Sequence, residues 1–249
     1  MLYLQCQKAS FIKNRRLVFS ILFLAFSFCA SAQQVLFQED HDSKPYYFGI
    51  SLGISKASFQ THLHPSFLQQ DSIMVAEPLN NGGFALGLLA TLHLSRRFEL
   101  RFNPQLIFAE RNLYYKLNTT YQPDLDFGYD VTKKVESVIT TFPVHFKFNS
   151  DRIGNFRVYL LAGGKFDLDL ASNAKARKAD DMIRIKRGDY GIEAGVGFNF
   201  YFPSFILSPE IKFSNGLNDL HDRNPNLNYS RVLEGIRSRM IMFTIHLEG

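Results

Sequence analysis

The sequence has almost no cysteine and no tryptophan. Among its 249 residues the only cysteines are Cys6 and Cys29. Both lie in the first 32 residues, which we predict to be a secretory leader that is removed. A mature chain without cysteine has neither a disulfide framework nor a thiolate metal site.

The leader prediction rests on three features in the order that export signals require. Basic residues come first, including Lys13, Arg15 and Arg16. An apolar run over 17–28 follows, and Ala-Ser-Ala at 30–32 matches a cleavage site. The run is shorter than the roughly 20 residues of a membrane-spanning helix. We therefore predict a signal peptide over 1–32, not an anchor, followed by a flexible N-terminal tail over 33–44.

Beyond the leader the sequence lacks long apolar runs and a charge excess. No later apolar stretch approaches 18 residues, which excludes a helical membrane span. Residues 33–249 contain 24 basic and 23 acidic residues, so the high isoelectric point owes much to the leader. A nearly neutral chain without a basic excess does not favour nucleic-acid binding.

Common catalytic and phosphate-binding motifs are also missing: we find no Gly-rich phosphate loop, no H-E-x-x-H and no G-x-S-x-G. His62 and His64 lie two residues apart in a predicted loop, but no further metal ligands accompany them. His221-Asp222 resembles a catalytic dyad, but no motif supplies a nucleophile for it. Asp167 and Asp169 form a potential carboxylate pair, although Lys165 on the same face favours a structural ion pair. We predict no catalytic residue, no metal site and no cofactor.

What the sequence does contain is strict alternation, clearest over 83–111. Two runs, 83–94 and 98–111, are separated by Ser95-Arg96-Arg97. Successive strand residues point to opposite faces, so each run has one apolar face. The opposite face of the second run carries Glu99 and Arg101. An apolar outside with a charged inside is typical of a membrane-spanning β-barrel.

The same alternation recurs along the rest of the chain. We predict eight strands, at 46–55, 83–94, 98–111, 135–149, 156–170, 189–201, 205–214 and 239–248. Their connections alternate between long and short, with long segments at 56–82, 117–132, 171–187 and 215–237. Outer-membrane barrels have short periplasmic turns and longer extracellular loops. We therefore predict an all-β fold over 45–249, a single eight-stranded antiparallel transmembrane β-barrel that crosses the outer membrane of a Gram-negative bacterium many times.

The inward faces of these strands carry many charges. An eight-stranded barrel has an interior just wide enough for side chains, and buried charges must be paired. We therefore predict a charge network that fills the barrel interior and opposes a wide pore. Its predicted members are Glu99, Arg101, Lys147, Arg157, Lys165, Asp167, Asp169, Glu193, Glu210 and Lys212.

The third long connection is rich in bases. Two interpretations stay open: a contact loop for lipopolysaccharide or a protein partner, or an ordinary solvated loop. Its basic residues are Lys175, Arg177, Lys178, Arg184, Lys186 and Arg187.

Several segments resemble one family of barrels. The most specific are F-x-L-R-F-x-P-x-L-x-F-A-E-R at 98–111 and S-P-E-I-K-F-S-x-G-L at 208–217, supported by KPYYFGISLGIS, TTFPVHFKF and VYLLAGGKFDLDLAS. Over nearly all of the mature chain the sequence resembles the PorT family of outer-membrane barrels from Bacteroidetes. That resemblance implies a non-enzymatic component of type IX (Por) protein secretion, which is linked in some members to gliding motility.

The implied partners are outer-membrane lipid, lipopolysaccharide and other secretion-system proteins, with no nucleic acid and no small-molecule substrate. Three alternatives remain. One is a small barrel enzyme acting on lipid or peptide, with Asp167, Asp169 and His221 at the outer mouth. The second is a generic structural barrel similar to OmpA and OmpX. The third, a passive porin, is opposed by the filled interior.

Overall fold

The computed structural model describes residues 35–65, 73–117, 130–171, 185–221 and 233–249. The chain divides into two units, residues 1–36 and 37–249. The predicted signal peptide lies outside the described residues, and the fold below is that of the second unit. No helix in the described part of the chain is long and apolar enough to cross a membrane.

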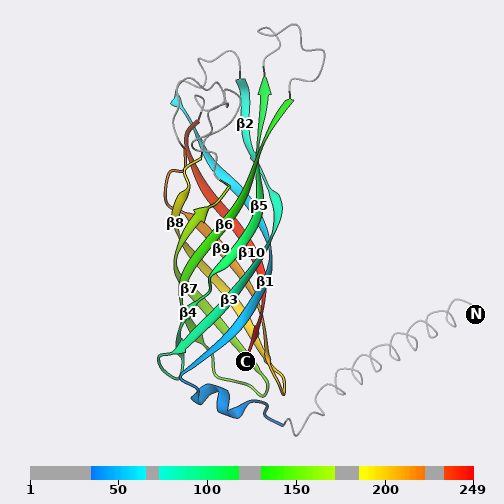
Figure 1. Cartoon of the computed structure of the whole chain (residues 1–249), viewed down its shortest axis with the longest axis vertical. Helices are drawn as coiled ribbons and strands as arrows, with labels where there is room; N and C mark the ends of the chain where they lie inside the picture. Colours follow the sequence, from blue (N-terminus) through cyan, green and yellow to red (C-terminus); the bar gives the residue numbers. More distant parts are fainter. Residues whose placement is uncertain (1–34, 66–72, 118–129, 172–184, 222–232) are drawn as a thin grey trace, which may run out of the picture. The chain divides into compact units, whose positions relative to one another are not determined.

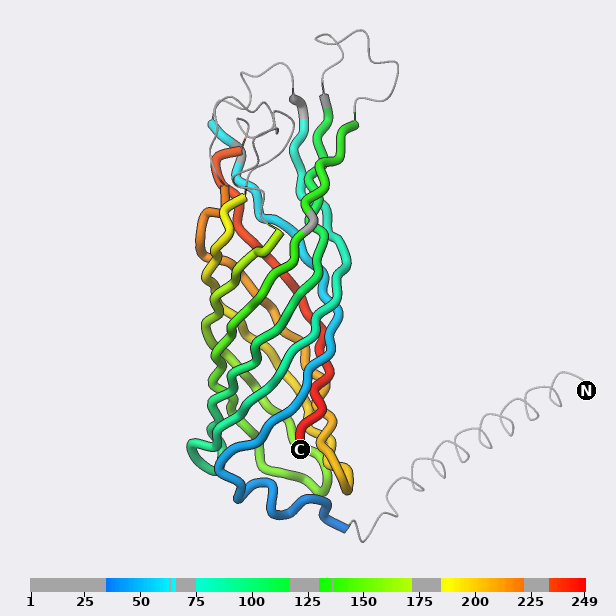
Figure 2. Tube along the Cα trace, in the orientation of Figure 1, coloured from blue at the N-terminus to red at the C-terminus, as the bar shows by residue number. Residues whose placement is uncertain are grey.

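The second unit is one antiparallel sheet closed into a ring (Figure 1). β1 pairs with β10 on one side and with β3 on the other, which closes the sheet. Figure 2 shows the blue first strand beside the red last strand at this junction. The strands are β1 (Tyr46–Leu63), β2 (Ile73–Leu79), β3 (Asn81–His93), β4 (Phe98–Phe102), β5 (Gln105–Leu117), β6 (Asp130–Asn149), β7 (Phe156–Asp169), β8 (Gly188–Tyr201), β9 (Ile206–Gly216) and β10 (Leu233–Glu248).

These ten strands occupy eight positions around the barrel. β4 and β5 are one barrel strand interrupted at Asn103 and Pro104, since both pair with β3 and β6 in a continuous register. Proline has no N–H to donate, so one ladder hydrogen bond is missing there, although the Pro104 carbonyl still accepts from the Leu88 amide at 3.0 Å. β2 continues β3 and pairs with β5 beyond Asn80. The predicted eight-stranded antiparallel barrel is therefore confirmed.

Alternation places apolar side chains on the outside of the ring. Ile54 and Leu88 are each 65% exposed and Phe48 is 62% exposed. Apolar side chains exposed in this number indicate that lipid, not water, covers the wall. The apolar outward residues of β1 run from Tyr46 to Ile54, roughly 27 Å of extended strand. At the tilt of barrel strands this spans most of a bilayer core.

The short connections lie at one end of the barrel, called here the turn end, and the strand ends that flank the long connections lie at the other, the loop end. Leu94 and Phe98 join across the first turn through a 3.0 Å backbone hydrogen bond, and Phe202 and Phe205 join across the third through one of 2.9 Å. In the second turn Gly154 adopts φ 59°, a conformation that favours glycine. By the rule for outer-membrane barrels the turn end is periplasmic.

Several strands are longer at the loop end than the sequence predicts. β1 continues to Leu63, β2 forms within the predicted loop 56–82, β6 begins at Asp130 and β10 at Leu233. The prediction of a loop over all of 56–82 is wrong. These extensions lie beyond the apolar band, where outward residues such as Lys56 and Gln60 are polar. The alternation is reversed there, because inward residues such as Ala57 and Phe59 are apolar and buried, while the backbone ladder continues.

The segment expected to be a flexible tail is instead held against the turn end from Phe37 onward. Glu39–Ser43 forms a short 3-10 helix. The Phe37 amide donates to Asn155 Oδ1 at 2.9 Å, and Gln38 Nε2 donates to the Phe202 carbonyl at 3.1 Å. The segment has no periodicity in sequence because single polar contacts, and not a repeating apolar face, hold it in place.

Candidate functional site

All ten charged residues predicted to face inward are buried, and each is within ion-pair distance of an opposite charge or a histidine. They form layers along the barrel axis, because inward residues on neighbouring strands meet at fixed register positions. The layers are described from the turn end to the loop end.

Glu99 is the centre of the layer nearest the turn end. Lys147, its direct cross-strand neighbour, places Nζ 3.2 Å from Glu99 Oε2. Tyr47 donates its hydroxyl to the same oxygen at 2.9 Å, and Asn149 Nδ2 donates to Oε1 at 2.5 Å. His93 Nε2 lies 3.1 Å from Oε1. Four groups from three strands therefore surround one carboxylate.

Arg101 dominates the middle of the barrel. Its guanidinium donates to Glu210 Oε2 at 3.0 Å and to Glu248 Oε1 at 2.7 Å, with no exposed surface. Tyr159 donates its hydroxyl to Glu210 at 2.7 Å, and Lys147 Nζ lies 4.1 Å from the centre of the Tyr159 ring. Arg101 thus connects β4 with β9 and β10 across the lumen and holds opposite walls together.

The next layer is built around Glu193. Its Oε2 atom lies 2.8 Å from His145 Nε2 and 3.9 Å from Lys212 Nζ. Lys212 also lies 3.7 Å from Glu210 Oε1, and His246 Nε2 lies 3.4 Å from that same oxygen. The layers therefore share residues, and the network is continuous from Glu193 to Arg101.

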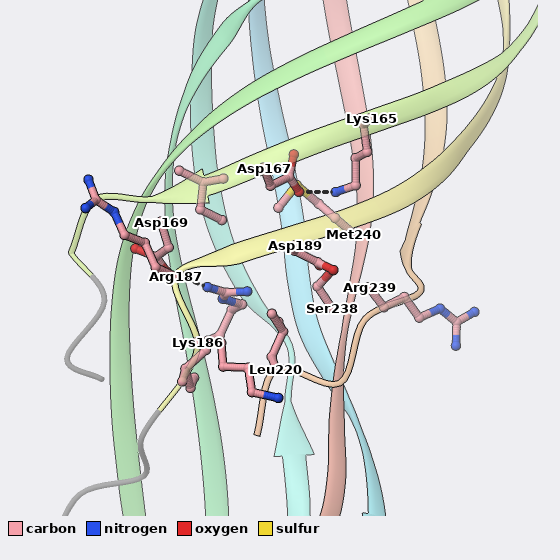
Figure 3. Close-up of a pocket in the computed structure, with 13 residues that line it drawn as sticks. Lys165, Asp167, Asp169, Lys186, Arg187, Asp189, Leu220, Ser238, Arg239 and Met240 are labelled. Atoms are coloured by element: carbon pink, nitrogen blue, oxygen red, sulfur yellow. Dashed lines mark hydrogen bonds and ion pairs between the residues drawn. The ribbon is translucent and has the colours of Figure 1, made fainter. Parts of the chain in front are cut away.

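The layer nearest the loop end surrounds a small cavity (Figure 3). Lys165 forms an ion pair with Asp167, Arg111 donates to Asp169 at 2.9 Å, and Ser238 donates its hydroxyl to Asp189. The cavity volume is about 20 Å³. That space accommodates roughly one water molecule and no substrate.

An apolar cluster closes the barrel beyond this layer. It includes Leu113 and Tyr115 of β5 together with Ile236 of β10, all without exposed surface. Ile185 and Leu220, from the connections on either side of β8 and β9, complete it. Water would have to pass both the charged layers and this cluster, so the described interior contains no open channel.

At the opposite end the N-terminal segment covers the charged layers. Asp42 accepts two hydrogen bonds from Arg157, at 2.8 and 2.7 Å. His41 is 3% exposed and its ring lies 4.5 Å from that of Tyr47. Burial is the main cause that lowers the pKa of His41 to about 4, against the opposing attraction of Glu248. A neutral imidazole therefore seals this end at neutral pH.

Two central members of the network were missed from sequence. On β10, Glu248 is the next inward residue after His246. On β5, Arg111 is the next inward residue after Gln105, Ile107 and Ala109. Continuing the inward–outward alternation by two residues along each strand is enough to predict both. Asp42 could not have been found that way, because no strand period reaches the N-terminal segment.

The residues considered for catalysis are used elsewhere. Asp167 and Asp169 are paired with Lys165 and Arg111, in agreement with the structural interpretation. His221 is buried in a backbone bridge with Ile185, while Asp222 lies outside the described residues. Among the described residues no group of three or more metal-ligating side chains is arranged to hold an ion.

The predicted basic contact loop is described only at its end. Lys175, Arg177, Lys178 and Arg184 lie outside the described residues. Lys186 and Arg187 are exposed, and Lys186 Nζ donates to the Asp219 carbonyl at 3.0 Å. Hydrogen bonds to Asp219 from the backbone amides of Ile236 and His221 lower the pKa of this carboxyl, even though burial opposes them.

Comparison with protein families agrees with this geometry. Residues 34–222 match the outer membrane protein beta-barrel domain family. The chain belongs to this family. Its place is therefore the outer membrane, as the sequence predicts, and its strands cross that membrane. A comparison of the sequence with curated proteins finds no match.

Small outer-membrane barrels are found among solved structures with a similar fold. Neisserial surface protein A is 12% identical with a TM-score of 0.44, covering 82% of this chain and 96% of its own. OprG from Pseudomonas aeruginosa has the same identity and TM-score, covering 83% and 94%. Ail from Yersinia pestis, solved with a heparin analogue, is 10% identical with a TM-score of 0.37, covering 83% and 100%.

Proposed function

We propose that this protein is a non-enzymatic component of type IX protein secretion that acts through its surfaces and not through its lumen. The observation that carries the proposal is the filled interior: Arg101, Glu210 and Glu248 bridge opposite walls without exposed surface. Buried charges joined in this way stabilise a barrel and leave no path for a solute.

The secretion role itself rests on the resemblance to the PorT family. The segments at 98–111 and 208–217 that carry the resemblance form β4, β5 and β9. They include both inward charges, such as Arg101 and Glu210, and outward apolar residues, such as Phe102 and Phe213. Because the resemblance to the PorT family includes the lumen charges, it supports a filled interior in common with that family as well as a common lipid-facing wall.

A deletion strain tests this function. We expect that removing the gene from a Bacteroidetes host abolishes surface delivery of cargo bearing the C-terminal targeting domain, while permeability to a large antibiotic such as vancomycin stays normal. A plasmid copy should restore delivery. Cargo that still reaches the surface would contradict the secretion role and would favour the alternative function, that of a generic structural barrel. Raised permeability alone would point to a general envelope defect.

Partner capture gives an independent test. A tagged copy solubilised from outer membranes in mild detergent should retain other secretion proteins. The matched control is an unrelated eight-stranded barrel of the same host with the same tag. Equal recovery of those proteins with both barrels would contradict a specific interface.

The enzyme alternative has less support. Asp167 and Asp169 are ion-paired inside the barrel, and the cavity beside them is about 20 Å³. A general acid or base must come within hydrogen-bond distance of its substrate. A double variant, Asp167→Asn with Asp169→Asn, should therefore support normal cargo delivery if it folds, whereas loss of delivery from a folded variant would revive a chemical role.

A further inference from the structure

The outer surface of β1 and β10 changes character abruptly toward the loop end. On β1 the outward residues are apolar as far as Ile54, and the next outward residue is Lys56. On β10 the outward residue Ile241 is followed toward the loop end by Arg239 and then Arg237. All three cations are exposed. They therefore begin at the upper edge of the lipid-facing band, one outward step above the apolar residues.

Sheet register brings the three cations into one strip. Lys56 pairs with Ile241, Ser58 with Arg239 and Gln60 with Arg237. Lys56 and Arg239 are thus diagonal neighbours on the same face, and such neighbours lie roughly 7–8 Å apart. Arg237 follows Arg239 at the next outward position of β10. This strip is called here the basic edge.

No acid in the described part of the chain forms an ion pair with the basic edge. Figure 3 shows the Arg239 side chain pointing away from the cavity and the charged residues around it. An acid, Asp219, lies beside Gly235 farther toward the loop end, but its carboxylate accepts the amides of Ile236 and His221. The basic edge thus contrasts with the lumen, where every predicted charge has a partner.

We propose that Lys56, Arg237 and Arg239 bind the phosphate groups of lipid A in the outer leaflet of the outer membrane. Lipid A is a glycolipid that carries phosphates on its sugar headgroup, directly above its acyl chains. Its chains would lie against Ile54 and Ile241, which places the phosphates at the height of the cations. Arginine is suited to this ligand because its planar guanidinium donates two parallel hydrogen bonds to phosphate.

The position of the basic edge favours lipid A over a soluble ligand. A cation one outward step above the apolar band reaches the headgroup region without leaving the wall, as long basic side chains at membrane boundaries do. A soluble anion or an acidic protein would have to enter the headgroup layer to reach Lys56. The inference needs only the outer-membrane location and is independent of the secretion role.

The test measures lipid binding by native mass spectrometry of the whole mature protein refolded in zwitterionic detergent with EDTA. The ligand is hexa-acylated lipid A with two phosphates, and its dephosphorylated form and inorganic pyrophosphate are the comparison probes. The test variant is K56Q/R237Q/R239Q. The matched control is R96Q/R97Q, which removes exposed cations at the turn end. A third variant, K56R/R237K/R239K, keeps the charges.

We expect the wild type and the turn-end control to bind lipid A equally. The charge-retaining variant should bind more weakly than the wild type, because lysine cannot donate two parallel hydrogen bonds, but more tightly than the test variant. The test variant should lose about five-fold in affinity for each cation and roughly 100-fold in total. Dephosphorylated lipid A should bind the wild type as weakly as lipid A binds the test variant. Pyrophosphate should not compete.

Three results would overturn the proposal: less than a three-fold loss in the test variant, an equal loss in the turn-end control, or full competition by pyrophosphate, which would indicate a site for free phosphate. Folding is checked by the mobility shift of unheated barrels on denaturing gels. If the triple variant does not fold, R239Q alone must show the five-fold loss.

Discussion

Replacing Arg101 by methionine should destabilise the barrel more than any change to a surface charge. Methionine keeps much of the volume of the side chain but removes its charge. Glu248 would then lose the one ion-pair partner that it has among the described residues, while Glu210 would keep Lys212, His246 and Tyr159. Leaving one buried charge without its partner costs about 3–5 kcal/mol.

The assay is urea unfolding of the refolded protein in detergent micelles. The chain has no tryptophan, so unfolding is followed by far-ultraviolet circular dichroism and by gel mobility. A second change, Glu248→Gln in the Arg101→Met background, removes the stranded charge and should recover at least half of the lost free energy of unfolding. The double-mutant cycle isolates this coupling.

The surface control is Arg97→Gln, which breaks an exposed ion pair with Asp151 of 2.8 Å. Exposed pairs contribute about 0–1 kcal/mol, so this variant should unfold almost as the wild type does. If Arg101→Met lowers stability by less than about 1 kcal/mol, or if adding Glu248→Gln deepens the loss, the lumen network does not hold the walls together.

Three further predictions concern close packing and the N-terminal segment. Gly197→Ala should lower stability by about 1–3 kcal/mol in the same unfolding assay, because the new methyl group would overlap the Tyr159 ring, whereas Gly164→Ala, whose nearest neighbour would be 3.8 Å away, should not. The docked N-terminal segment should be fully stable above the ordinary His41 pKa of 6.5 and should loosen as pH falls toward about 4, because the imidazole of the released segment binds a proton at a higher pH than the buried imidazole does; the rate of cleavage at 37–44 by pepsin-type proteases, divided by the rate for the His41→Phe variant at the same pH, should rise over that range, and a constant ratio would contradict the role of His41. Asp42→Asn should release the same segment at neutral pH, seen as faster amide hydrogen exchange, and unchanged exchange would refute its role.

Alternation predicted the wall of the barrel well, because lipid imposes the same demand on every spanning residue. Ile50, Leu86 and Phe146 had to face outward, and the charges between them had to face inward. The same period placed all ten predicted network residues in the lumen. Which acid meets which base was not predictable, because ion pairs such as Arg101 with Glu248 join strands far apart in sequence and depend on register.

Where the chain leaves the lipid, that demand ends and prediction weakens. The sequence predicts a loop where β2 and the outer half of β1 lie, because apolar residues such as Phe59 face inward there and polar residues such as Lys56 face outward, the reverse of the lipid-facing pattern. The sequence predicts a flexible tail for the N-terminal segment, whereas Asp42 and His41 hold it against the barrel. Individual contacts of this kind leave no period to detect.

The claim that the interior is structure and not a passage is tested most directly by conductance. The mature protein would be reconstituted into a planar lipid bilayer, with insertion verified by protease digestion of matching vesicles. Because charged layers, the apolar cluster and the N-terminal segment fill the lumen in series, we expect no channel steps above the bare bilayer. Reproducible steps that increase in number with the protein inserted would contradict the account.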